Sequence, residues 1–235
     1  MSKVLIVYIA TGDYKTYFDK FKKSLDKFLP KTEKILFLIS DDEKFNKKHA
    51  IYSRLIEHLP WPIVTLMKFK YINDAIEATK SEEPSHVFYF NANVDFDREV
   101  TEKVFLSSRL IAVEHSNLLV HCKNDPSSLR TEMDGISAID HPYVYVAGGV
   151  VGGPIELMKE AATTIFEWTK TELAQNYIPQ WHDESYWNKY VDLNQDKVKI
   201  LPAIYGCPED DYLMSIYMPS IVYRNSDLTQ NQKGK

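Results

Sequence analysis

Two acids, an imidazole and several aromatic rings lie close together in the last quarter of the chain, where residues 181–190 have the sequence WHDESYWNKY. A carboxylate such as that of Glu184 can stabilise positive charge on a reacting carbon or attack that carbon, and aromatic faces stack on sugar rings. Judged locally, Asp183 and Glu184 are equally suited to favour the start of a helix through its dipole. The segment is a candidate site for chemistry on a sugar.

A second polar motif, Asn91-Ala92-Asn93, directly follows the apolar run at residues 86–90. Its two amides can hydrogen-bond ribose or phosphate oxygens, although a simple Asx turn at a strand end would use the same residues. Neutral amides are poor ligands for a hard dication because they do not supply the charge that offsets ion dehydration. Asp95, two residues after Asn93, offers one carboxylate, so weak metal binding remains an alternative to a site without metal.

The bulk composition is that of a globular protein, with 235 residues of which 44% are hydrophobic and 26% are charged. The net charge of −5 excludes the broad basic surface that nucleic-acid binding requires, so we expect no nucleic-acid partner. No stretch has the length and apolarity of a transmembrane segment, and the apolar residues 4–9 indicate a strand rather than a signal peptide. The two cysteines, Cys122 and Cys207, indicate buried thiols in a reducing cytoplasm.

Periodicity predicts alternating strands and helices, which are typical of an α/β fold around a parallel-centred sheet. The predicted strands are residues 3–9, 34–39, 51–55, 86–90 and 109–114, and the predicted helices are residues 15–28, 63–79, 155–174 and 184–191. Polar loops are expected at residues 40–43 and 115–142, the latter as a mobile loop on the acceptor side. Paired glycines in residues 143–154 permit close backbone approach to a ligand.

Ligands of such sheets bind beyond the carboxyl ends of the strands. The turn after the first strand, Ala10–Asp13, and the segment Asn91–Asp95 both follow predicted strands. We therefore expect these two segments to face one pocket.

Three segments, in this order along the chain, resemble glycosyltransferase family 6, the group of the histo-blood-group A and B transferases and the α1,3-galactosyltransferases. They are the turn Tyr8–Tyr14, the segment Ala147–Gly153, and residues 181–190 with Trp181-His182-Asp183-Glu184-Ser185. The resemblance implies a GT-A fold, a single Rossmann-like mixed sheet flanked by helices. It divides a single domain, residues 1–223, into a UDP-binding part at 1–95 and a donor-sugar and acceptor part at 96–223, followed by a flexible tail at 224–235.

The resemblance also implies site residues. Glu184 would lie beneath the anomeric carbon as the catalytic carboxylate. Donor-binding residues would be Ile9, Thr11, Tyr14, Lys68, Asn91, Ala92, Asn93, Ala147, Gly148, Gly149, His182 and Asp183. Acceptor-binding residues would be His115, Trp181 and Glu184, with Glu132 near the same region. The tail would contribute Arg224, Lys233 and Lys235 to the diphosphate.

Several of these residues have simpler alternatives. Tyr14 is expected to border uracil, but it could instead be a core residue on the helix side. His115 could be structural, and terminal lysines are usually solvated. Tyr186 and Trp187 are expected in the core.

The implied reaction is a retaining transfer of a hexose from a UDP-sugar to a glycan hydroxyl. Ala147 and Gly149 occupy positions where small side chains leave room for an acetamido group, which favours UDP-GalNAc over UDP-galactose. The asparagine pair matches the bacterial branch of the family, which works without metal, so we expect no cofactor.

The expected acceptor is a terminal, α1,2-fucosylated galactose. A cytoplasmic protein is expected, with peripheral contact at the inner membrane face if the acceptor is lipid-linked. The alternatives are an α1,3-galactosyltransferase and an inactive module that binds a UDP-sugar or glycan.

Overall fold

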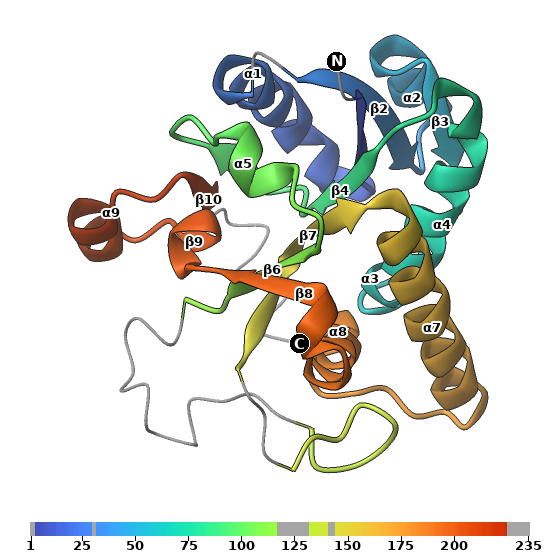
Figure 1. The fold of residues 1–235 in the computed structure, drawn as a ribbon. Coiled ribbons are helices and arrows are strands. Elements are labelled where there is room, and N and C mark those ends of the chain that lie inside the picture. The colour runs from blue at the N-terminus through green and yellow to red at the C-terminus, as the bar shows by residue number, and fades with distance from the viewer. Residues whose placement is uncertain (1–2, 30–31, 117–131, 141–143, 225–235) are drawn as a thin grey trace.

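The computed structural model of the chain describes residues 3–29, 32–116, 132–140 and 144–224 (Figure 1). Much of the loop expected at residues 115–142 lies outside these ranges. The tail after Arg224, with Lys233 and Lys235, also lies outside them.

A central sheet of seven strands has the order β3-β2-β1-β4-β7-β6-β8. The strands are β1 Lys3–Ile9, β2 Glu33–Ser40, β3 Tyr52–Leu55, β4 His86–Phe90, β6 Leu110–Glu114, β7 Val146–Pro154 and β8 Val198–Leu201. The first four are parallel, β7 is antiparallel to both β4 and β6, and β6 and β8 are parallel again. The sheet is mixed, and the α/β class expected from the sequence is confirmed.

The reversed direction of β7 decides where the sheet can build a site. Its first residues lie at the edge where β4 and β6 end, because Val146 pairs with Glu114 and the Asn91 amide donates to the Gly149 carbonyl at 2.8 Å. Asn91 and Ala147–Gly149 are therefore neighbours although more than fifty residues separate them in the chain. The carboxyl ends of β1 and β4 lie at this same edge.

Helices cover both faces of the sheet, and Figure 1 shows α1 and α7 on opposite sides of it. The α-helices are α1 Phe18–Phe28, α2 Glu43–His49, α3 Ile63–Leu66, α4 Lys68–Ala78, α5 Glu102–Phe105, α7 Ile155–Ala174, α8 Asp183–Leu193 and α9 Asp211–Tyr217. The 3-10 helices are η1 Gly12–Tyr17, η2 Lys80–Glu82, η4 Gln195–Lys197 and η5 Ala203–Tyr205.

The apolar run of β1 explains this two-sided cover, because alternate residues of a strand point to opposite faces. Leu5, Val7 and Ile9 belong to the core cluster under α4, α7 and α8. Tyr8 and its alternate neighbours Val4 and Ile6 belong to the cluster under α1 and α5.

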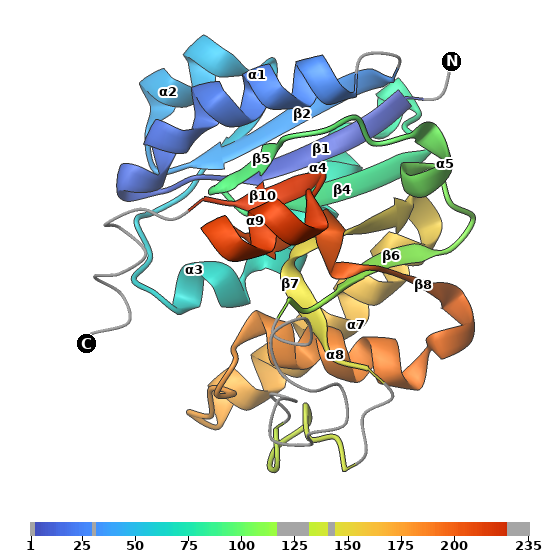
Figure 2. The same cartoon turned by 90° about the vertical axis from the view of Figure 1, so that its left-hand side faces the viewer.

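A small second sheet joins β5 Val94–Phe96, β10 Ile221–Tyr223 and β9 Cys207–Pro208. Figure 2 shows β5 and β10 in front of the central sheet, with α9 beside them. Buried Phe96 and Ile221 join this sheet to the core cluster under α1. The last strand of the described chain is thereby placed next to the asparagine motif.

Several elements differ from the prediction. The expected loop at residues 40–43 contains the N-cap of α2, where Asp42 accepts from the amides of Lys44 and Phe45. The expected helix at residues 63–79 is broken at Met67, where ψ of −1° leaves the helical range. Strands β5, β9 and β10 are too short to show a periodic pattern in the sequence.

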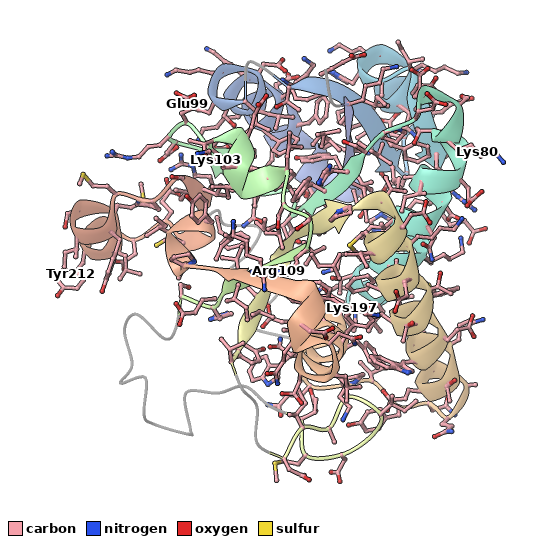
Figure 3. All side chains as sticks on the ribbon, viewed as in Figure 1. Lys80, Glu99, Lys103, Arg109, Lys197 and Tyr212 are labelled. Atoms are coloured by element: carbon pink, nitrogen blue, oxygen red, sulfur yellow. The ribbon has the colours of Figure 1, made fainter. Side chains whose placement is uncertain are left out.

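The outer surface carries charges of both signs. Lys80, Glu99 and Lys103 point outward from the ribbon in Figure 3, and all three are exposed. Tyr212 of α9 also points outward and is 70% exposed.

Candidate active site

A cavity of about 500 Å³ opens at the carboxyl ends of β1 and β4. It is lined by Ile9, Thr11, Gly12, Asp13, Tyr14, His58, Leu59, Trp61, Val64, Thr65, Tyr89, Asn91, Ala92 and Asn93. The turn after the first strand and the asparagine motif thus face one pocket, as the sequence predicted. The side chain of Tyr14 both lines this cavity and packs, half-buried, on the core cluster under α1.

The asparagine motif is held by backbone and tyrosine contacts. The Tyr89 hydroxyl donates to Asn91 Oδ1 at 2.8 Å, and the Tyr8 hydroxyl donates to the Ala92 carbonyl at 2.7 Å. Asn93 Nδ2 donates to the Arg224 carbonyl at 3.1 Å. Residues from three strands therefore fix the motif at the cavity wall.

The start of α8 meets the cavity through Trp61 and Thr65. The His182 ring lies edge-on to Trp61, with ring centroids 4.4 Å apart. His182 has φ of +56°, a conformation that a histidine adopts at a cost and that re-aims the chain into α8. Burial lowers the pKa of His182 against the effect of the carboxylates of Asp183 and Glu132, so the imidazole is neutral at pH 7.

Asp183 is the centre of a buried charge pair. Lys68 is 1% exposed, and its Nζ donates to Asp183 Oδ2 and, at 2.6 Å, to the Gly148 carbonyl. Thr65 Oγ1 donates to the other carboxylate oxygen of Asp183 at 2.5 Å. Thr65 and Lys68, which are three residues apart, both reach the Asp183 carboxylate.

This placement changes the role expected for Lys68. The resemblance implied a donor-binding residue, but the Lys68 ammonium is held by the Asp183 carboxylate and the Gly148 carbonyl. In the described structure its charge is balanced by Asp183, so it fixes α8 against β7.

Glu184 is held by two hydrogen bonds. The Tyr145 hydroxyl donates to Oε1 at 2.5 Å, and the Gly148 amide donates to Oε2 at 2.7 Å. His115 Nε2 lies 4.0 Å from Oε1. The carboxylate is thus oriented by β7 and by the residue that follows β6, which brings together His115, Glu184 and the Ala147–Gly149 segment.

The glycines of β7 make room for protein groups. A Cβ atom at Gly148 would lie 3.2 Å from Asp183 Oδ2 and 3.2 Å from the Cβ of Glu184. A Cβ at Gly149 would lie 2.5 Å from the Tyr223 ring and 2.8 Å from Asn91 Nδ2, and one at Gly152 would collide with Phe88. The sequence suggested that a ligand approaches the backbone of these glycines; in the structure, residues of α8, β10 and β4 pack closely against that backbone.

Trp181 and Glu132 meet at the entrance to α8. Glu132 is 6% exposed, and its Oε1 accepts from the Trp181 amide at 3.0 Å and from Ser185 Oγ at 2.7 Å. The short described segment 132–140 is thereby attached to α8. Tyr186 and Trp187 are fully buried, as predicted.

Arg224 is surrounded by carboxylates. Its Nε donates to Asp95 Oδ2 at 2.8 Å, its Nη1 donates to Glu209 at 3.0 Å, and its Nη2 donates to Asp97. Lys20 pairs with the same Asp95 oxygen at 2.9 Å. Arg224 therefore closes the small sheet and is fully engaged in these pairs, whereas the sequence had placed it at the diphosphate.

Several polar groups around the motif are engaged by protein partners. The side-chain oxygen of Asn91 accepts from the Tyr89 hydroxyl, and the side-chain nitrogen of Asn93 donates to the Arg224 carbonyl. Asp95 is 3% exposed and already neutralised by Lys20 and Arg224. Within the described ranges, no group of three or more His, Cys, Asp or Glu side chains is arranged to hold a metal ion.

Sequence reasoning missed four residues of the site. Trp61 and Thr65 carry no local signal, because a mid-chain loop and a short helix only reach α8 in three dimensions. Tyr145 lies in an aromatic run before the glycines, and this run could have suggested a hydrogen-bond donor to Glu184. Tyr223 lies in a strand too short to predict.

A mixed α/β sheet, a cavity at its strand ends and a fixed carboxylate beside that cavity define a glycosyltransferase with a GT-A-like fold, which uses a nucleotide-sugar donor and a glycan acceptor. The sequence profile of glycosyltransferase family 6 matches residues 3–220. The chain is also 32% identical, over 212 residues that cover 87% of each protein, to the O-antigen biosynthesis glycosyltransferase WbnI of Escherichia coli. The chain belongs to glycosyltransferase family 6. None of the helices in the described ranges has the length and apolarity needed to cross a membrane.

Proposed function

We propose that the protein is a retaining α1,3-N-acetylgalactosaminyltransferase that moves GalNAc from UDP-GalNAc to a terminal, α1,2-fucosylated galactose. The observation that carries this proposal is the carboxylate of Glu184, fixed between the Tyr145 hydroxyl and the Gly148 amide. A carboxylate held in this way stabilises positive charge at the anomeric carbon or forms a glycosyl intermediate with it.

The donor nucleotide is proposed to occupy the cavity. Tyr14 borders the uracil, with Ile9 and Thr11 beside the base, and the amides of Asn91 and Asn93 contact ribose or phosphate oxygens. His182, being neutral, accepts or donates a hydrogen bond to the donor sugar without adding charge. Asp183 is proposed to contact a sugar hydroxyl, with oxygens that also accept from Lys68 and Thr65.

Catalysis is proposed to proceed without metal. The leaving diphosphate must then be stabilised by fixed donors and cations. Lys68 and Arg224 are engaged in carboxylate pairs, so Lys233 and Lys235 of the tail, outside the described residues, are the remaining proposed cations.

The choice of GalNAc rests on the small residues Ala147 and Gly149; because Tyr223 and Asn91 fill the space at Gly149, Ala147 is the position proposed to leave room for an acetamido group. Galactose is the second candidate, since the same space admits the smaller sugar. The acceptor-side contacts are proposed for His115, which lies beside Glu184, and for the indole of Trp181. The name of the Escherichia coli relative, an O-antigen biosynthesis glycosyltransferase, favours an O-antigen glycan as the acceptor.

The test is UDP release from UDP-GalNAc and, separately, from UDP-galactose, with 2′-fucosyllactose as acceptor. Each donor is assayed with excess EDTA and with added Mn²⁺. Acceptor-dependent turnover that resists EDTA, faster with UDP-GalNAc, is the expected result. Faster turnover with UDP-galactose would assign the galactosyltransferase, and UDP binding without turnover of either donor would identify a binding module.

A further inference from the structure

The Tyr223 hydroxyl is buried beside the proposed site without a hydrogen-bond partner. Its oxygen has less than 1 Å² of accessible area, and no partner for it is found within the described ranges. Buried hydroxyls nearly always have a partner, and one without a partner calls for an explanation such as a catalytic role or a bound water or ion. Within the described residues, the Tyr223 hydroxyl is such a group.

The backbone around Tyr223 is fixed from three directions. Tyr223 pairs with Val94 in β5 and with Pro208 in β9, and the Tyr223 carbonyl accepts from the Glu209 amide at 2.9 Å. The next residue, Arg224, is locked by its carboxylate pairs. The hydroxyl is thus held in place by rigid elements, as a preorganised donor must be.

Two glycines form a slot around the ring of Tyr223. A Cβ at Gly149 would lie 2.6 Å from the hydroxyl oxygen, and a Cβ at Gly206 would lie 3.3 Å from it. The side-chain nitrogen of Asn91, Nδ2, would lie 2.8 Å from the same Cβ at Gly149. The Tyr223 hydroxyl and the Asn91 side-chain amide are therefore neighbours. Asn91 lines the cavity, whereas Tyr223 is not among the lining residues, so the hydroxyl would reach a bound group only beside the Asn91 side-chain amide.

The hydroxyl also keeps its proton. Burial, with the negative charge of Glu184 added to it, raises the pKa of Tyr223 above its ordinary value. At neutral pH the group is a donor, and it lies near the side-chain amide of Asn91.

From this geometry we propose that the Tyr223 hydroxyl donates a hydrogen bond to the departing diphosphate of the donor. The inference rests on the proposed function. As the bond between the anomeric carbon and the β-phosphate oxygen breaks, its electron pair stays on that oxygen, and Tyr223 stabilises the new charge without transferring its proton. Tyr223 and Asn91 then form a pair of neutral donors, where a metal ion would otherwise act.

The test is Tyr223→Phe, which keeps the ring in its slot and removes only the hydroxyl. The kcat for UDP-GalNAc, or for UDP-galactose if that is the preferred donor, should fall about 10- to 100-fold, the effect of losing one donor to a charged group. The Kd for UDP should rise less than kcat falls, because the charge develops in the transition state. The melting temperature should stay equal or rise, because an unpartnered buried hydroxyl is removed.

Tyr52→Phe is the matched control. Its hydroxyl donates to Glu82 at the far edge of the sheet, and its loss should leave kcat unchanged. A folded Tyr223→Phe protein with kcat within twofold of wild type would overturn the proposal, as would a fall in melting temperature without an effect on kcat.

Failure of the proposed function is recognised separately. If the wild-type protein turns over neither donor, calorimetry with UDP still compares wild type with Tyr223→Phe. A Kd at least threefold higher in the variant would support a diphosphate contact, and equal Kd values would overturn it.

Discussion

At the scale of single residues, the position of Glu184 is decided by atoms that do not neighbour it in the sequence. Replacing Glu184 by Gln keeps the size of the side chain and its bond from Tyr145, but removes the charge. We expect transfer to fall by about 10³-fold or more, as for loss of a catalytic nucleophile or stabilising carboxylate. Calorimetry should show unchanged affinity for UDP, and turnover at the wild-type rate in a folded Glu184→Gln protein would contradict the assignment.

Gly149 provides a second residue-scale prediction. In this chain, a methyl group at position 149 would meet Tyr223 and Asn91 before it meets a sugar. Gly149→Ala should therefore reduce kcat with UDP-GalNAc and with UDP-galactose together, and lower the free energy of unfolding by about 1–3 kcal/mol through overpacking.

The comparison variant is Gly206→Ala, whose nearest contacts of 3.1 and 3.3 Å require only a small adjustment. Its effect on both donors should be smaller. A switch of Gly149→Ala from one donor to the other, without loss of total activity, would show that the donor sugar and not Tyr223 occupies this space.

At the scale of elements, the attachment of α8 to the sheet depends on Lys68 and on Asn188. The Asn188 side chain makes two hydrogen bonds of 2.8 Å with the backbone of Val146, one to the amide and one to the carbonyl. These bonds join α8 to the first residue of β7. Lys68 adds a buried charge pair with Asp183. The Glu184 carboxylate is thus carried on a helix that is fixed to β7 at both its first turn and its second.

Lys68→Met should leave Asp183 buried without its counter-charge. The expected loss in free energy of unfolding is about 3–5 kcal/mol, measured by urea denaturation. Lys68→Met combined with Asp183→Asn should recover part of this loss, because both charges are then absent. Equal stability of Lys68→Met and wild type would show that the pair does not hold α8.

At the scale of the whole molecule, Asp41 connects three distant segments at the cavity rim. It accepts from the Gly12 amide and from Lys15 Nζ, each at 2.9 Å, and it lies 2.6 Å from His58 Nδ1. Burial would raise its pKa, but the hydrogen bonds from Lys15, Gly12 and His58 hold the pKa of Asp41 at about 2.

A pKa that is lower in the folded protein than in the unfolded chain stabilises the fold above the unfolded value and loses this effect as pH falls. The contribution of Asp41 should therefore be complete above about pH 4 and disappear towards the folded pKa of about 2. Melting temperatures recorded between pH 6 and pH 2 should fall less steeply in Asp41→Asn than in wild type. Parallel curves would contradict this role.

The sequence by itself determined the α/β class, the long strands and helices, and the identity of the two polar motifs. Local periodicity carries this information, because β1 is apolar throughout and α7 is long and amphipathic. It also placed the turn after β1 and the asparagine motif at one cavity, since parallel strands end at one edge.

Only the tertiary structure decided how the charges are used. Lys68 and Arg224 are cations that the sequence assigned to a ligand, yet each is balanced by carboxylates from remote segments. The missing partner of Tyr223 and the reason for Gly149 depend on β10 lying against β7. Such pairings join residues far apart in the chain, and a local pattern cannot encode them, because the free energy of burying a charge or a hydroxyl depends on what the fold places beside it.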